Sequence, residues 1–218
     1  MIGIYGGTFN PVHFGHLRTA LEVKELFDLQ LLSLIPCRLP AHRQQPDVDA
    51  EMRLAMLKLA SADMSGFYVD RRELDREGPS YMVDTLATLR EEYPQTGLIL
   101  FIGLDAFAGL STWHQWQRLF DYAHLVVMTR PQCARSDLPV FLQQRVCANR
   151  DSLRQQRAGL LFFQTVTALD ISATTIRTLI AAGRNPKFLL PDAVISYIRR
   201  HQLYLSSEQD SECKQNNS

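Results

Sequence analysis

Residues 6–16 read GGTFNPVHFGH and directly follow the apolar run 1–5, which has the length and composition of a β-strand. Glycines at a strand end let the backbone turn sharply and approach a ligand closely. Asn10 followed by Pro11 is typical of a helix N-cap and the first helical residue, so we expect a helix over residues 11–27. Because the free N–H groups of a helix start favour anions, the stretch predicts a strand, a glycine turn and a helix that bind phosphate.

Two histidines, His13 and His16, lie three positions apart near the start of this expected helix. That spacing places both imidazoles on one side of the helix, and Gly15 between them keeps that side open. Two histidines at this spacing are more often surface residues or hydrogen-bonded core groups. The surrounding string of glycines, proline and helix cap instead favours an anion site.

A second motif, DISATTIR at residues 170–177, follows an apolar run and opens another expected helix. Ser172 is the natural N-cap, and Ile176 lies on the apolar face of the helix. Thr174 and Arg177 share roughly the opposite face, so they predict a second anion site. The alternative is an ordinary capped amphipathic helix.

Outward from these motifs, apolar runs of strand length alternate with stretches of helical periodicity. We expect strands at residues 1–5, 31–35, 67–69, 98–102, 125–128 and 160–164, and helices at 11–27, 50–62, 81–93, 140–150, 173–182 and 191–201. This alternation predicts an α/β fold, a single Rossmann-like doubly wound parallel sheet with helices on both faces. Residues 1–205 form the expected domain, and the polar stretch 206–218 is expected to be a disordered C-terminal tail.

Charge and cysteine content limit the partners. The chain has 23 basic and 23 acidic residues, which favours a small phosphorylated ligand over nucleic acid or a membrane surface. The four cysteines lie far apart without zinc-site spacing, and no signal peptide or membrane span is recognisable, so we expect a cytoplasmic protein with reduced thiols.

The first motif resembles the GGxFDPxHxGH signature of the nucleotidyltransferase superfamily, with Asn10 where the family usually has Asp. The second matches that superfamily's ISxTxIR motif. Further segments are similar to bacterial nicotinate-nucleotide adenylyltransferases, although Ala41 stands where a second proline is common. These segments are Ile35-Pro36, residues 40–43, Pro79-Ser80-Tyr81 with Thr85-Leu86, residues 102–105, Thr112-Trp113, Arg130-Pro131 and residues 189–204.

This resemblance implies transfer of AMP from ATP to nicotinate mononucleotide, giving deamido-NAD and pyrophosphate in NAD biosynthesis. Mg²⁺ is expected on the phosphates. Because no acidic pair has the spacing of a protein-made metal cage, we expect no side-chain metal site, and direct attack by a phosphate would need no covalent intermediate. Whether the chain forms a homo-oligomer stays open. The implied catalytic residues are His13, His16 and Arg177. The implied ATP-binding residues are Gly6, Gly7, Thr8, Phe9, Gly103, Asp105, Ser172, Thr174 and Thr175, and the nicotinate mononucleotide site comprises Tyr81, Thr85, Trp113, His42, Arg43 and Arg130.

Other interpretations remain open from the sequence. The first motif also suits phosphopantetheine adenylyltransferases and cytidylyltransferases, or a nucleotide sensor without turnover. The sequence suits an exposed loop residue at Asp105 as well as it suits a ribose-binding one. Solvated loop charges are likewise an equally good interpretation of His42, Arg43 and Arg130. The charge run 70–73 is interpreted as a solvated loop. The helix around residues 51–59 and the side chain of Trp116 are interpreted as parts of the packed core.

Overall fold

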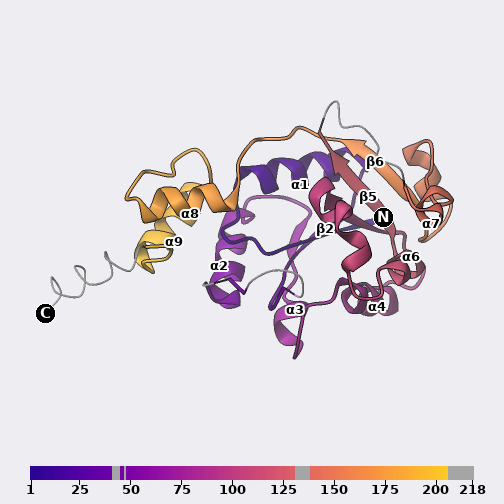
Figure 1. Cartoon of the computed structure of the whole chain (residues 1–218), viewed down its shortest axis with the longest axis horizontal. Helices are drawn as coiled ribbons and strands as arrows, with labels where there is room; N and C mark the ends of the chain where they lie inside the picture. The colour runs from indigo at the N-terminus through magenta and orange to yellow at the C-terminus, as the bar shows by residue number, and fades with distance from the viewer. Residues whose placement is uncertain (41–44, 47, 131–137, 206–218) are drawn as a thin grey trace, which may run out of the picture.

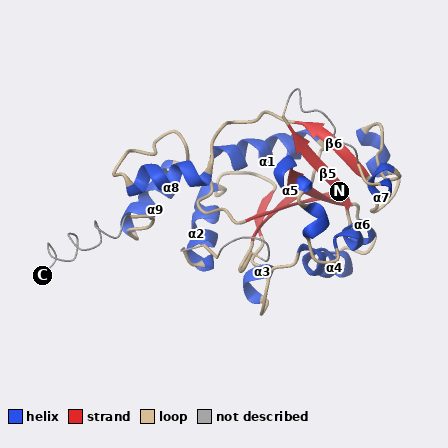
Figure 2. Cartoon of the chain, in the orientation of Figure 1, coloured by secondary structure: helices blue, strands red, loops and turns tan. Residues whose placement is uncertain are grey.

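A computed structural model describes residues 1–40, 45–46, 48–130 and 138–205. Six strands form one sheet in the order β3-β2-β1-β4-β5-β6, and every neighbouring pair is parallel. Figure 2 shows the sheet in red with helices packed around it. The strands are β1 (Ile2–Gly7), β2 (Leu31–Pro36), β3 (Phe67–Val69), β4 (Leu98–Gly103), β5 (His124–Thr129) and β6 (Leu161–Thr165).

Successive side chains of each strand point to opposite faces of the sheet, so the core has two layers. In β4, Ile99 and Phe101 pack into one cluster, while Leu98, Leu100 and Ile102 pack into the other. The first cluster receives α1 (Phe14–Leu26), α2 (Ala50–Ala60), α8 (Ala173–Ala181) and α9 (Asp192–Arg200). The second receives α4 (Met82–Glu92), α6 (Leu119–Tyr122) and α7 (Val140–Gln143). The expected sheet with helices on both faces is therefore confirmed.

The strand order reverses between β1 and β4, which is where an open parallel sheet binds its ligand, beyond the carboxyl ends of the strands. The turn after β1 leads to α1, and β4 runs directly into the short helix α5 (Leu104–Ala108). Figure 1 shows that the chain leaves β6, passes over α1 and ends in the pair α8 and α9, with α2 between that pair and the sheet. The C-terminal helices are thus brought to the region of the β1 turn.

All six expected strands are present, with bounds shifted by at most a few residues. The expected helix starting at residue 11 is wrong at its start, because α1 begins at Phe14. The helix expected over 140–150 ends at Gln143, and short helices at Arg72–Asp75 (α3), α5 and α6 were not anticipated. No helix within the described ranges is long and apolar enough to cross a membrane.

The charge run 70–73 is not a solvated loop. Asp70 and Glu73 are buried, and Arg72 opens α3 while its guanidinium pairs with Asp70 at 2.6 Å and with Glu92 at 3.0 Å. Local charge density predicted exposure, but Asp70 pairs with Arg72 within the run, Arg72 also pairs with Glu92 of α4, and Glu73 accepts a hydrogen bond from Thr85. The packing interpretation holds for Trp116, whose ring lies edge-on to Phe141 with centroids 5.1 Å apart.

Candidate active site

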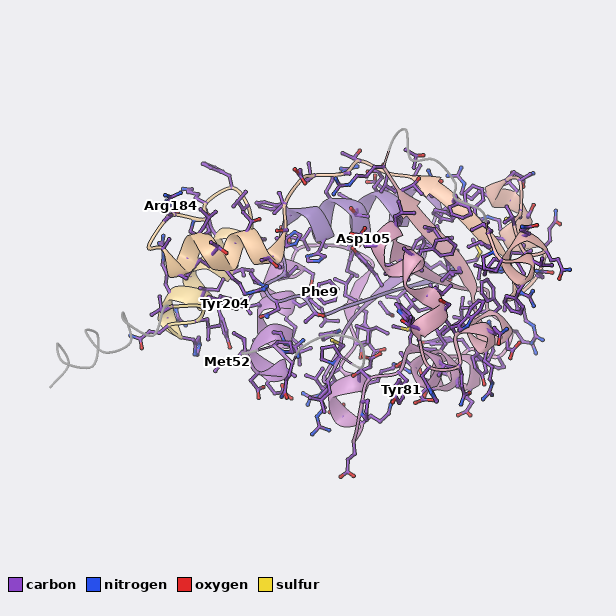
Figure 3. All side chains as sticks on the ribbon, in the orientation of Figure 1. Phe9, Met52, Tyr81, Asp105, Arg184 and Tyr204 are labelled. Atoms are coloured by element: carbon purple, nitrogen blue, oxygen red, sulfur yellow. The ribbon has the colours of Figure 1, made fainter. Side chains whose placement is uncertain are left out.

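The turn between β1 and α1 is built on two glycines that have close neighbours. A Cβ on Gly6 would lie 2.5 Å from Cε of Met82, the first residue of α4, so the glycine lets that side chain pack against β1 without shifting. Gly7 lies under the ring of Phe9, which is buried and has a φ of 46°. Since the Phe9 side chain belongs to the core, only its backbone is available to a ligand. Figure 3 shows Phe9 between Tyr204 on one side and Asp105 and Tyr81 on the other.

The two histidines lie together at the start of α1, as their spacing predicts. His13 is the N-cap, and the His13 and His16 rings are 3.8 Å apart between centroids with a 31° tilt. Nδ1 of His16 accepts from the backbone N–H of His13 at 3.4 Å, so a neutral His16 carries its proton on Nε2. A Cβ on Gly15 would be 2.9 Å from Nδ1 of His13, which explains the glycine between them.

Both imidazoles are neutral at pH 7 in the ligand-free chain. Burial lowers the pKa of His13 to about 4. Burial, with a smaller contribution from His13, lowers the pKa of His16 to about 3. Nδ1 of His13 is buried without a hydrogen-bond partner within the described part of the chain, so it keeps unused hydrogen-bonding capacity. An approaching anion favours the protonated imidazole and raises both pKa values.

Asn10 is not the helix cap that the sequence predicts. Its carbonyl oxygen accepts from Nη1 of Arg177 at 2.8 Å, and its Oδ1 accepts from the hydroxyl of Tyr204 at 2.6 Å. These contacts join residues 167 and 194 positions apart in the chain. Asn10 is therefore a junction between the β1 turn and the C-terminal elements, and His13 takes the cap position instead.

The start of α8 has the predicted geometry. Oγ of Ser172 accepts from the backbone N–H of Thr175 at 3.0 Å and lies 2.8 Å from its Oγ1. Nη2 of Arg177 donates to Oγ1 of Thr174 at 3.3 Å, while Ile176 is fully buried on the other face. The polar face of α8 therefore meets the β1 turn, and the two sequence motifs lie together.

Two further predicted residues lie at strand ends. Asp105 is exposed in the first turn of α5, directly after Gly103 at the end of β4. Arg130 is exposed after β5, and its Nη2 lies 3.8 Å from Oδ1 of Asp170, before α8. Both therefore lie at the carboxyl edge of the sheet, with their side chains accessible.

Aromatic side chains gather where α4 begins. Tyr81 is the N-cap residue of α4, and its ring stacks on His114 with centroids 4.4 Å apart and a 33° tilt. Trp113 precedes His114 and packs against the α4 side of the core. His114 was not anticipated from sequence, although its position next to Trp113 was a signal. His42 and Arg43 lie outside the described residues.

The expectation that the Thr85 hydroxyl contacts a ligand is corrected. Thr85 is fully buried, its Oγ1 donates to Oε1 of Glu73 at 2.7 Å, and it accepts from Nη2 of Arg76 at 2.9 Å. Its single hydroxyl proton is thus already used. Burial is also the main reason that the pKa of Glu73 is raised. Thr85 therefore belongs to a buried polar network with Glu73 and Arg76, one helical turn after Tyr81.

The contact of Arg53 with the β1 turn is a feature that sequence reasoning missed. Arg53 was interpreted with its helix as packing, yet its guanidinium donates to the carbonyl oxygen of Thr8 at 2.7 Å. A signal was present, because Arg53 shares a helix face with Met56, Leu57 and Ala60, which are all buried. An arginine on an apolar face requires polar partners inside the protein.

The arrangement as a whole defines a nucleotidyltransferase-type α/β protein, with paired histidines and a helix-borne arginine around the turn after β1. The cytidylyltransferase-like family model matches residues 4–179. The chain is 50% identical over 208 residues to a probable nicotinate-nucleotide adenylyltransferase of Methylococcus capsulatus, covering 94% of this chain and 99% of that protein. It is 48% identical to a protein of the same description from Acidithiobacillus ferrooxidans, covering 93% and 95%.

The chain belongs to the nicotinate-nucleotide adenylyltransferase family. Among solved structures, a Plasmodium falciparum nicotinic acid mononucleotide adenylyltransferase complexed with NaAD aligns with a TM-score of 0.71 at 16% identity, covering 93% of this chain and 96% of that one. A putative nicotinate-nucleotide adenylyltransferase from Vibrio parahaemolyticus aligns with a TM-score of 0.64, also at 16% identity. At that identity these structures support the fold alone.

Proposed function

We propose that this chain transfers AMP from ATP to nicotinate mononucleotide, releasing pyrophosphate and forming deamido-NAD. Family membership supports the reaction. One contact supports the proposal that the reaction takes place at this site. Nη1 of Arg177 reaches the carbonyl oxygen of Asn10, which joins the late motif to the turn that holds His13 and His16. Three groups suited to phosphate oxygens are therefore held at one strand end.

The reaction we assign is direct attack by the phosphate of nicotinate mononucleotide on the α-phosphorus of ATP, with pyrophosphate leaving in line. The attacking phosphate is already ionised near neutral pH, so no side chain is needed as its general base. His13 and His16 donate hydrogen bonds to phosphate oxygens, and Arg177 stabilises the charge that moves to the leaving group. Ser172, Thr174 and Thr175 would hold the far side of the triphosphate, and Asp105 the adenosine ribose.

For the acceptor, we assign the nicotinate ring to Tyr81 and Trp113. Because the Thr85 hydroxyl is bound to Glu73, we assign carboxylate recognition to backbone N–H groups near Trp113 and in the first turn of α4, and give Thr85 a positioning role. Arg130 is proposed for the acceptor phosphate on its exposure after β5. His42 and Arg43 keep the same proposed role without structural support.

Magnesium is proposed as an ion bound to the substrate phosphates. Within the described residues, no group of three or more His, Cys, Asp or Glu side chains is placed to hold a metal ion. When bound, Mg²⁺ would neutralise part of the phosphate charge. His13, His16 and Arg177 would orient the phosphates that carry it. The cytoplasmic location remains a proposal that rests on family membership.

The direct test is pyrophosphate release from ATP and Mg²⁺ with a panel of acceptor phosphates. Nicotinate mononucleotide, phosphopantetheine and a sugar phosphate, the last with CTP as donor, cover the related activities. We expect turnover with nicotinate mononucleotide and none with the other two. Turnover with phosphopantetheine alone, or ATP binding without pyrophosphate release, would overturn the proposal.

A further inference from the structure

Arg53 has an environment that is unusual for a charged residue. It is 1% exposed and is the largest of the fully buried side chains in the described part of the chain. Nη1 donates to the carbonyl oxygen of Thr8 at 2.7 Å, Nη2 to that of Arg38 at 3.1 Å, and Nε to that of Val48 at 3.2 Å. The guanidinium is therefore hydrogen-bonded by backbone carbonyl groups.

These three carbonyl groups come from three segments that meet at the carboxyl edge of the sheet. Thr8 is in the turn after β1, Arg38 follows β2, and Val48 precedes α2. Figure 1 shows α2, the helix that contains Arg53, between the sheet and the pair α8 and α9. One side chain thus fixes the relative position of all three segments.

The charge of Arg53 is not neutralised by an ion pair within the described ranges, where no carboxylate lies within salt-bridge distance of it. An arginine stays protonated in proteins, so a full positive charge is buried there. Arg177 is bound in the same way, to the carbonyl oxygen of Asn10 and to Thr174. Two guanidinium groups therefore hold carbonyl groups of one short turn, and an anion at that turn would offset the cost of burying the charge.

We propose that Arg53 is a positioning residue for the triphosphate of ATP, an inference that rests on the proposed function. By holding the carbonyl of Thr8, it fixes the direction in which the N–H groups of the β1 turn point. Its buried charge also raises the affinity of that turn for an anion. Arg53 does not touch the substrate in this account and acts through Thr8.

The chain supplies a matched control in Arg90. Its guanidinium also donates to backbone carbonyl groups, those of Tyr93, Thr96, Tyr122 and Arg157, at distances from 2.6 to 3.1 Å. These residues precede β4, β5 and β6, so Arg90 lies at the amino edge of the sheet, opposite the site. Substitution of Arg90 therefore removes the same kind of hydrogen bond to carbonyl groups but leaves the proposed phosphate site unchanged.

The experiment compares Arg53→Lys, Arg53→Gln and Arg90→Lys in the full chain. Steady-state rates give kcat and separate KM values for ATP and for nicotinate mononucleotide, and calorimetry gives the Kd of Mg²⁺-pyrophosphate. We expect Arg53→Lys to raise the KM for ATP roughly tenfold, the scale of one weakened charge-assisted hydrogen bond. Arg53→Gln should raise it further because the charge is lost, and the pyrophosphate Kd should follow the same order. The KM for nicotinate mononucleotide should change little, and Arg90→Lys should lower the melting temperature without changing either KM.

Two outcomes would contradict the inference. Equal ATP KM and pyrophosphate Kd in wild type and the Arg53 variants, with only a lower melting temperature, would make Arg53 a structural residue like Arg90. Failure of both Arg53 variants to fold, while Arg90→Lys folds, would make it a determinant of folding. If wild type binds pyrophosphate but shows no turnover, the proposed function fails, while the pyrophosphate Kd values still decide the role of Arg53.

Discussion

The hydroxyl of Tyr204 donates to Oδ1 of Asn10 at 2.6 Å, so the last described stretch of the chain is bonded to the turn that follows the first strand. Asn10 also accepts from Arg177 through its carbonyl oxygen, and one residue therefore links the C-terminal segment to a proposed catalytic arginine. Burial raises the pKa of Tyr204, so its hydroxyl remains a donor across the physiological range.

Tyr204→Phe should destabilise the fold by about 1–2 kcal/mol, because Oδ1 of the buried Asn10 loses its partner. It should also lower kcat several-fold, because the Asn10 carbonyl that orients Arg177 is less firmly held. Urea unfolding and steady-state rates check this. Tyr197→Phe, which removes a hydroxyl from a ring stacked on His201, is the control. A normal kcat in Tyr204→Phe would show that Asn10 orients Arg177 without help.

His16→Ala should leave the fold intact and lower kcat by about 10²–10³, the usual scale for losing one preorganised donor to the transition state. His201→Ala, which removes an exposed histidine beyond α9, should have no effect on kcat. Near-normal turnover in His16→Ala would remove His16 from the mechanism. A matching loss in His201→Ala would show that the assay reports stability rather than chemistry.

Thr85→Val should destabilise the protein by about 1–3 kcal/mol, since a buried Glu73 oxygen and an Arg76 N–H both lose their partner. The KM for nicotinate mononucleotide should rise modestly through movement of Tyr81, without loss of preference for the carboxylate. Chemical denaturation and competition kinetics measure the two effects separately. Loss of the acceptor preference at normal stability would return Thr85 to direct contact with the substrate.

Acid should destabilise the ligand-free protein through its buried histidines. An unfolded histidine has a pKa near 6.5, whereas burial lowers that of His13 to about 4. Below pH 6.5 the unfolded chain therefore binds a proton that the folded chain does not, and the free energy of unfolding falls until about pH 4. The raised pKa of Glu73 acts in the opposite direction, so wild type must be compared with a variant.

His13→Gln should flatten the dependence between pH 6.5 and 4 by at most about 1.4 kcal/mol per pH unit, the limit for one group. Unfolding free energies from urea titrations at several pH values give both slopes. Parallel curves for wild type and His13→Gln would contradict the lowered pKa.

The sequence predicted the six strands, because strands depend on local patterns. The family resemblance, rather than a local pattern, implied that His13, His16 and Arg177 act together, and the contact of Arg177 with Asn10 brings α8 to the turn before the histidines. Strand runs alternate regularly, and a capped helix after a strand places its first residues at the sheet edge. The parts that could not be predicted depend on distant contacts. Asn10 resembles a cap locally but is bound by Arg177 and Tyr204, and Thr85 is hidden by Glu73.

The central claim is that this site adenylylates nicotinate mononucleotide, and acceptor choice tests it most directly. Nicotinate and nicotinamide mononucleotides share a shape and differ only in carboxylate against amide, so an aromatic slot at Tyr81 and Trp113 alone would barely separate them. Backbone donors around those rings would leave the amide NH₂ facing a donor, at a cost of about 2–4 kcal/mol. Competition between the two acceptors at fixed ATP and Mg²⁺ should therefore favour nicotinate mononucleotide by about thirtyfold to a thousandfold in kcat/KM. Equal use of both acceptors would contradict the assignment.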